Sequence, residues 1–183
     1  METSGKTILS HPKFALTIER LCYQLIENHD DFTNTCFIGV QPRGTDFANR
    51  IYQRLSQLTD ISKVPTGILD VTFYRDDFRR SGKILAASPT EMDFLVEGKD
   101  VVLIDDVLYS GRTIRAALTA LSHYGRAKSV ELLTLVDRRF NRELPIQSEY
   151  NGITVDAVDE AYIKVYWKEI HGEDKIVLYP NKI

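Results

Sequence analysis

Two adjacent carboxylates, Asp105 and Asp106, directly follow an apolar run at residues 101–104. Four apolar, mostly β-branched residues in succession are typical of a buried parallel strand. Ligands of open α/β sheets bind at the carboxyl ends of the strands, so the two acids stand where a ligand would meet them. Carboxylates accept hydrogen bonds from hydroxyl groups and help to hold metal ions. We therefore expect the pair to face a hydroxyl-bearing ligand such as a ribose.

A short polar loop comes next in the chain, and apolar residues at helical spacing follow it from 114 to 121. Its residues are Tyr109, Ser110, Gly111, Arg112 and Thr113. The first turn of a helix presents unpaired backbone N–H groups that bind phosphate. The loop therefore predicts a phosphate site beside the two acids. The plainer alternative is a strand–helix connection whose polar side chains only cap the helix.

A second strand–loop–helix unit precedes this one, with a strand predicted at 35–40. The loop after that strand holds Gln41, Pro42, Arg43 and Gly44. Glycine lets the backbone approach a ligand closely, and an arginine side chain can bind phosphate through two parallel hydrogen bonds. This loop is a second candidate anion site. Alternatively, it is a turn that happens to contain a surface arginine.

The stretch from 74 to 98 has no clear periodicity and is longer than most connections in a compact domain. Four basic groups lie in its first half, at Arg75, Arg79, Arg80 and Lys83. Long loops of this kind are usually either functional or disordered. We predict a flexible basic loop that closes over a polyphosphate, against the alternative of a solvated charged loop.

The order of the central motif resembles the phosphoribosyl pyrophosphate (PRPP) motif of the type I phosphoribosyltransferases: a hydrophobic strand, two acids, then serine, glycine and threonine. Three longer stretches narrow the resemblance, namely LDVTFYRDD at 69–77, DDVLYSGRTIRAAL at 105–118, and VDR followed by RELPI within 136–146. Together they resemble the PyrR family, pyrimidine regulators that are also uracil phosphoribosyltransferases. The likeness covers about residues 7 to 180.

The resemblance implies the type I phosphoribosyltransferase fold, a single α/β domain over residues 1–183 whose mainly parallel twisted sheet is flanked by helices. It also implies a small hood over the base at approximately 137–152 and a flexible loop at approximately 74–98. The apolar patterns predict strands near 35–40, 67–73, 101–105 and 129–136, and helices near 11–29, 44–58 and 112–124, the first capped by Ser10. Closing strands are expected between 153 and 179.

The resemblance further implies the reaction, a transfer of phosphoribose from PRPP to uracil that gives UMP and pyrophosphate, as in pyrimidine salvage. Asp105 and Asp106 would bind the ribose hydroxyls beneath the positive charge that develops on the sugar. The loop 109–113 would hold the 5′-phosphate, and the loop 41–44 would hold pyrophosphate under the basic loop. Mg²⁺ would be held largely by PRPP oxygens and water, with no direct protein ligand.

Base recognition is expected in the hood and at the phosphate loop. Asp137 and Arg138 begin the hood segment that would cover the base. Tyr109 stands where purine transferases of this type usually place an aspartate that handles a purine ring proton, and a phenol does not replace a carboxylate in that role. A pyrimidine is therefore favoured, uracil before orotate, with another base as the alternative. The hood is one residue longer than the family pattern, at 139–141, and lacks a glycine.

The alternative function is the second role of the family, UMP-dependent RNA-binding attenuation of pyrimidine genes. Regulatory members have an arginine-rich first helix, whereas residues 13–31 of this chain hold two basic and four acidic side chains, a balance of −2. Ile153 replaces a lysine of the family pattern, and the whole chain has a formal charge of −3. Affinity for nucleic acid depends mostly on phosphate contacts, so we expect RNA binding to be disfavoured.

The remaining features are those of a globular chain of 183 residues. No apolar run approaches the roughly 18 residues of a membrane span, and no signal sequence is evident, so a cytoplasmic protein without membrane contact is expected. Cys22 and Cys36 have no second cysteine or histidine at metal spacing and are predicted to be buried free thiols. The family resemblance implies a homodimer or homotetramer.

Overall fold

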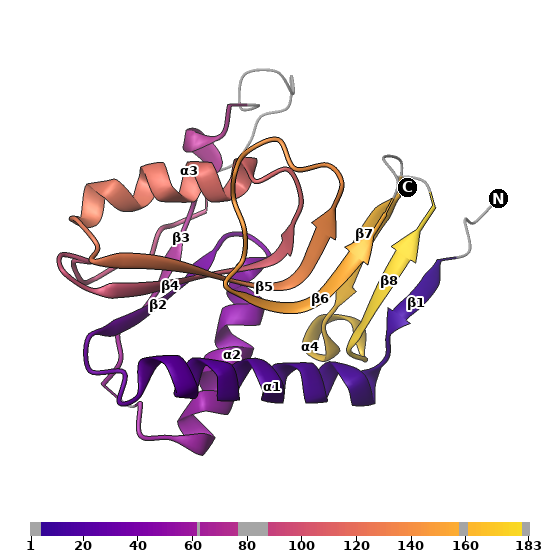
Figure 1. Ribbon diagram of the computed structural model, residues 1–183, viewed down its shortest axis with the longest axis horizontal. Coiled ribbons are helices and arrows are strands. Elements are labelled where there is room, and N and C mark those ends of the chain that lie inside the picture. Colours follow the sequence, from indigo (N-terminus) through magenta and orange to yellow (C-terminus); the bar gives the residue numbers. More distant parts are fainter. Residues whose placement is uncertain (1–4, 62, 77–87, 158–160, 181–183) are drawn as a thin grey trace.

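The computed structural model, which describes residues 5–61, 63–76, 88–157 and 161–180, is an α/β structure with two sheets (Figure 1). Among these residues, the larger sheet has five strands in the order β3-β2-β4-β5-β6, and all neighbouring pairs are parallel. Its strands are β2 (Thr35–Val40), β3 (Thr66–Leu69), β4 (Asp100–Leu108), β5 (Ser129–Arg139) and β6 (Tyr150–Asp156). Because the strands are parallel, the loops that follow β2, β4 and β5 meet at one edge of the sheet.

Helices cover both faces of this sheet (Figure 1). α1 (His11–His29) and α2 (Gly44–Leu58) lie on one face, and α3 (Arg112–Leu121) lies on the other. Two apolar cores result, with Phe14 and Phe47 in the first and Leu103 and Ala117 in the second. Burial on both faces explains the continuous apolar run in β4. None of the described helices is long and apolar enough to cross a membrane.

A smaller antiparallel sheet brings together the two ends of the chain. It consists of β1 (Lys6–Leu9), β8 (Lys175–Tyr179) and β7 (Tyr162–Tyr166), in that order, with the short helix α4 (Lys168–His171) between β7 and β8. The ring centroid of Trp167 lies 5.4 Å from that of Phe14 in α1 and 6.1 Å from that of Phe47 in α2. Arg50 of α2 adds an ion pair with Asp174 at 3.0 Å. The smaller sheet is therefore fixed against the helices at two separate points.

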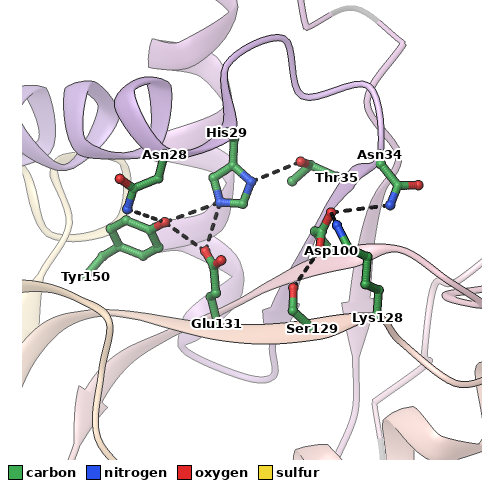
Figure 2. Close-up of polar contacts among 9 residues, drawn as sticks. All are labelled: Asn28, His29, Asn34, Thr35, Asp100, Lys128, Ser129, Glu131 and Tyr150. Atoms are coloured by element: carbon green, nitrogen blue, oxygen red, sulfur yellow. Dashed lines mark hydrogen bonds and ion pairs between the residues drawn. The ribbon is translucent and has the colours of Figure 1, made fainter.

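Polar side chains connect the amino ends of the strands of the larger sheet (Figure 2). His29, at the end of α1, hydrogen-bonds Thr35 at 3.1 Å and Glu131 at 2.9 Å. The Tyr150 hydroxyl donates to the same Glu131 carboxylate at 2.8 Å and accepts a hydrogen bond from Asn28 at 3.0 Å. A second group joins Asp100 to Asn34, Lys128 and Ser129. These contacts stabilise the amino ends of the strands, at the opposite end of the sheet from the predicted site.

The predicted α/β class with a mainly parallel sheet is confirmed, and α1 and α2 begin and end at the predicted residues. Ser10 occupies the N-cap position of α1, but its side chain makes no capping hydrogen bond, contrary to the prediction. The third helix is shorter than predicted, because α3 ends at Leu121 and residues 122–124 form a 3₁₀ turn, η2, that leads into Gly125. The expected closing strands are present as β6, β7 and β8.

The predictions for three strands are wrong in extent. β3 ends at Leu69, because the Asp70 carboxylate accepts hydrogen bonds from the Thr72 N–H at 3.0 Å and the Thr72 hydroxyl at 2.6 Å. Such a contact turns the backbone, and a 3₁₀ helix, η1 (Thr72–Tyr74), follows. β4 continues past residue 105 because its pairing with β5 extends to Leu108 and Asp137. β5 in turn continues past residue 136 because its pairing with β6 reaches 139.

The predicted hood and the predicted basic loop have different outcomes. The hood segment, 137–152, runs from the end of β5 through an irregular loop into β6. Of the basic loop, Arg79, Arg80 and Lys83 lie outside the described residues. The later part of that loop is tied to the edge of the sheet, where the backbones of Ile68 and Glu91 exchange two hydrogen bonds of 2.8 Å. Coverage of a base by the hood and movement of the loop stay predictions.

Cys22 and Cys36 are free and fully buried, as predicted. Burial raises the pKa of the Cys22 thiol to about 12 and the pKa of the Cys36 thiol to about 11. Both thiols are therefore protonated at neutral pH and act as small apolar groups of the core.

Candidate active site

A cavity of about 740 Å³ lies at the carboxyl ends of β2 and β4, beside the beginning of β7. Its lining includes nine residues of the predicted site: Gln41, Pro42, Arg43, Arg75, Asp105, Asp106, Tyr109, Thr113 and Arg138. The volume is within the range of small-molecule sites. Residues at the carboxyl ends of β2, β4 and β5, or in the loops that follow these strands, therefore meet in one cavity, as the parallel order of the sheet predicts.

The acid pair extends from β4 into this cavity and is almost completely buried. The N–H of Asp106 donates to Asp105 Oδ1 at 3.0 Å. Burial, together with the neighbouring carboxylate, raises the pKa of Asp105 well above its ordinary value. Burial also raises the pKa of Asp106, to about 6, although the Arg43 guanidinium opposes this shift. The pair can accept hydrogen bonds from ligand hydroxyls, and a ligand that brings positive charge would favour its full ionisation.

The loop after β2 lies directly against β4 because Gly44 has no side chain. A Cβ atom at this position would collide with the Ile104 carbonyl oxygen and lie 3.0 Å from Asp105 Cα. The preceding residue, Arg43, lines the cavity. Burial alone would lower the pKa of Arg43, but the neighbouring Tyr162 side chain and the charges of the acid pair raise it overall. The Arg43 guanidinium therefore stays positively charged near the acid pair, at the predicted second anion site.

The loop between β4 and α3 has the geometry of an anion-binding helix end. Gly111 is the N-cap of α3 with a φ of +89°, a left-handed conformation that favours glycine. The first N–H groups of α3 therefore have no partners within the helix and can bind an anion. The Thr113 hydroxyl accepts a hydrogen bond from Arg75 Nη1 at 3.0 Å. The structure thus brings the first arginine of the basic loop to the predicted phosphate site.

Of the predicted residues that the structure describes, five do not contribute to the lining: Gly44, Ser110, Gly111, Arg112 and Asp137. The Ser110 carbonyl accepts a hydrogen bond from the Glu143 N–H at 3.0 Å, and the Glu143 carboxylate accepts one from Arg112 Nε at 2.7 Å. Asp137 forms an ion pair with Arg142. These groups join the loop after β5 to the phosphate loop and so hold the wall of the cavity in place.

Arg138 and Tyr109 form a stacked pair in the cavity. The guanidinium carbon of Arg138 lies 4.1 Å from the centre of the Tyr109 ring, and both residues line the cavity. A stacked guanidinium and phenol offer a flat face and cationic donors to a planar ligand.

Phe140, in the longer hood segment, has a φ of +80°, a conformation that is uncommon for a residue other than glycine.

Four further described residues line the cavity and were absent from the predicted site: Val107, Ala161, Tyr162 and Ile163. The last three belong to β7 or directly precede it. No motif surrounds them in the sequence, and aromatics at such spacing more often have core or interface roles. They reach the cavity only because the smaller sheet packs beside the larger one, so only the tertiary structure identifies them.

The donor set is compatible with Mg²⁺ that arrives with a polyphosphate. Within the described ranges, no group of three or more histidine, cysteine, aspartate or glutamate side chains could hold a metal ion. Magnesium in proteins usually keeps several waters and takes one or two carboxylates together with phosphates of the substrate. The buried carboxylates of Asp105 and Asp106 at the cavity wall fit that limited role.

Comparison with known proteins gives one consistent family. Residues 4–170 match the model of the phosphoribosyl transferase domain. A "Bifunctional protein PyrR" from Microcystis aeruginosa is 44% identical over 171 residues, which are 93% of this chain and 95% of the relative. The protein of the same name from Picosynechococcus is 42% identical over 178 residues, 97% of this chain and 99% of the relative. The one from Clostridioides difficile is 40% identical over 171 residues, 93% and 96% of the two chains.

Solved structures confirm the fold. A hypoxanthine phosphoribosyltransferase from Staphylococcus aureus aligns with a TM-score of 0.67 at 21% identity, covering 93% of this chain and 90% of the other. The hypoxanthine phosphoribosyl transferase of Trypanosoma cruzi aligns with a TM-score of 0.72 at 15% identity, covering 98% and 93%. At these identities the likeness concerns the architecture alone, which is that of the type I phosphoribosyltransferases.

Proposed function

Since the chain belongs to the phosphoribosyl transferase family and, within it, to the bifunctional PyrR proteins, we propose that it transfers phosphoribose from PRPP to uracil, giving UMP and pyrophosphate. The chain is a phosphoribosyltransferase, and the proposal concerns its base and the roles of its residues. The observation that supports it most is one cavity in which a buried acid pair, residues of the two candidate anion-binding loops and a stacked arginine–tyrosine pair meet. Pyrimidine salvage in the cytoplasm, by a homodimer or homotetramer, completes the proposal.

Asp105 and Asp106 are assigned to the ribose. In the reaction the bond between ribose C1 and pyrophosphate breaks, and uracil N1 forms the new bond while losing its proton. The sugar becomes electron-poor as pyrophosphate leaves, so carboxylates beside it stabilise the transition state. The burial of both acids favours this role, because few waters screen their charge.

The two anion sites are assigned to the two ends of PRPP. The loop 41–44, with Arg43, would bind pyrophosphate. Arg75, whose side chain hydrogen-bonds Thr113 of the other loop in this structure, would close over the pyrophosphate when PRPP binds. Arg79, Arg80 and Lys83 are proposed to assist from the part of the basic loop outside the described residues. The loop 109–113 would bind the 5′-phosphate through its N–H groups and Thr113. Mg²⁺ bound with PRPP would neutralise part of the charge of the leaving pyrophosphate.

The base is assigned to the face formed by Tyr109 and Arg138, with Asp137 holding the adjoining loop through Arg142. Arg138 supplies cationic donors that suit the carbonyl oxygens of a pyrimidine. Tyr109 supplies no carboxylate for a purine ring proton. Uracil is therefore proposed ahead of orotate and of the purine bases.

Turnover of PRPP with individual bases tests this proposal. Purified protein should consume PRPP with uracil faster than with orotate, hypoxanthine or guanine, and faster turnover with a purine would refute the base. Asp105→Asn and Asp106→Asn should each lower kcat by roughly 10²- to 10³-fold, by the measure of other electrostatic contacts in active sites. Glu27→Gln, an exposed carboxylate on α1, is the matched control and should leave kcat unchanged.

Family membership also supports a second candidate, the UMP-dependent RNA-binding attenuator of pyrimidine genes. Because the first helix is acidic overall, the arginines of the hood are the basic patch that such an RNA would have to contact. Two of these arginines have acidic partners. Arg139 pairs with Asp156 at 2.7 Å, and Arg142 pairs with Asp137. Such partners reduce the charge that a phosphate backbone would meet. We therefore place RNA binding second.

A further inference from the structure

Arg112 belongs to the predicted phosphate loop, but its side chain does not line the cavity. Its guanidinium pairs with two carboxylates that come from different parts of the chain. Asp76 follows the 3₁₀ helix η1 at the beginning of the basic loop, and Glu143 lies in the loop after β5. One side chain in the first turn of α3 therefore joins the basic loop to the hood.

The contact with Glu143 starts from a firmly held backbone. The Glu143 N–H donates to the Ser110 carbonyl at 3.0 Å. A Cβ atom on Gly111 would lie only 3.3 Å from Ile146 Cδ1, so the loop after β5 packs closely against the phosphate loop. The Glu143 carboxylate accepts hydrogen bonds from Arg112 Nε at 2.7 Å and from Arg112 Nη2. These bonds orient the planar guanidinium.

The contact with Asp76 holds the residue next to Arg75. Arg112 Nη1 donates to Asp76 Oδ2, and Arg115, about one turn further along α3, pairs with the same oxygen at 2.9 Å. Arg75 donates from Nη1 to the Thr113 hydroxyl at 3.0 Å and lines the cavity. Because Asp76 directly follows Arg75, fixing Asp76 also fixes the point from which the Arg75 side chain reaches the cavity.

We propose that Arg112 is a positioning residue, which holds Arg75 at the cavity through Asp76 and does not itself bind the phosphates of the substrate. The inference rests on the proposed function, in which Arg75 binds PRPP. A long side chain binds an anion more strongly when its position is fixed before the ligand arrives, because less conformational entropy is lost on binding. The two carboxylates also occupy N–H donors of Arg112 that a phosphate would need.

Stabilisation of the fold is a weaker explanation for these contacts. The side chains of Arg112, Asp76 and Glu143 are 43%, 32% and 49% exposed. Ion pairs at such exposure contribute little to the free energy of unfolding, because water screens them and two long side chains lose freedom. Breaking these contacts should therefore change the affinity for PRPP more than the stability of the protein.

Arg112→Gln tests the inference, because it removes the charge and keeps much of the length of the side chain. We expect KM for PRPP and the calorimetric Kd for PRPP to rise about 3- to 10-fold, the effect of one charge-assisted contact at a half-exposed site. The KM for uracil should stay unchanged, and the melting temperature should fall by less than about 2 °C.

Arg54→Gln is the matched control. Arg54 of α2 donates from Nη2 to Glu19 of α1 at 2.6 Å, and the two side chains are 34% and 32% exposed. Neither residue lines the cavity. The control therefore removes an ion pair of the same kind and should leave the Kd for PRPP unchanged.

Double-mutant cycles test whether Arg112 acts through Asp76 and Arg75. In the Asp76→Ala and Arg75→Gln backgrounds, Arg112→Gln should change the Kd for PRPP less than twofold. A side chain that binds phosphate itself would keep its full effect in both backgrounds. That result, or an unchanged Kd in Arg112→Gln alone, would overturn the inference. Asp76→Ala alone should raise the Kd by a similar factor, and it tests the same contact if Arg112→Gln folds poorly.

The calorimetric Kd for PRPP is independent of the choice of base. If the native protein binds PRPP but does not use uracil, the base proposal fails and the Kd still tests Arg112. If the native protein does not bind PRPP, the proposed function and this inference both fail.

Discussion

Replacing Tyr150 by phenylalanine should destabilise the protein without changing its active site. Tyr150 is 1% exposed, and its hydroxyl donates to Glu131 at 2.8 Å and accepts from Asn28 at 3.0 Å (Figure 2). The substitution removes one hydrogen bond to a carboxylate and leaves a second donor without its partner. Such losses cost about 2 kcal/mol in free energy of unfolding, and Glu131 keeps its contact with His29 at 2.9 Å. For a chain of this size the melting temperature should fall by about 4 to 8 °C.

Thermal and urea unfolding monitored by circular dichroism measure this effect. Tyr23→Phe is the control, because Tyr23 is 50% exposed on α1 and a surface substitution should change the free energy of unfolding by less than about 0.5 kcal/mol. PRPP turnover at 25 °C should be the same in both variants, because the cluster lies at the amino ends of the strands and the cavity at their carboxyl ends. A loss below about 0.5 kcal/mol in Tyr150→Phe, or a loss of turnover without unfolding, would refute this reasoning.

Three other predictions follow from the site and the surface. In the ligand-free protein the pKa of Asp106 is raised to about 6, so the folded state keeps a proton that the unfolded state already releases at lower pH. The free energy of unfolding should therefore fall as pH rises from about 4 to about 6. Urea titrations should show this fall, and the fall should be smaller in Asp106→Asn. Gly44→Ala should cost about 1 to 3 kcal/mol and weaken PRPP binding, because its Cβ would meet the β4 backbone; melting and calorimetry check both, and normal values would contradict the close packing. In filter-binding titrations with pyrimidine-operon leader RNA, UMP should give no tight complex that survives moderate salt, and the appearance of one would favour the regulator.

The candidate site could be predicted in part because its central motif is contiguous. The acids at 105 and 106 and the loop at 109–113 follow one strand directly, so the order of residues along the chain also gives their order in space. The glycine at 111 adopts the left-handed conformation on which that loop depends. Tyr162 carries no comparable signal, because its place in the cavity lining depends on the packing of the smaller sheet.

The helices 11–29 and 44–58 were determined by the sequence itself, because helical hydrogen bonds are local and the spacing of apolar residues marks the buried face. Strand ends were decided by the tertiary structure, since β4 continues to Leu108 only where β5 offers a partner. The same holds for the chemistry of the acids. Their sequence positions suggested a ligand, but the raised pKa of Asp106 comes from burial that only the folded protein creates. Local patterns determine helices and contiguous loops, whereas pairing, burial and the meeting of distant side chains require the assembled fold.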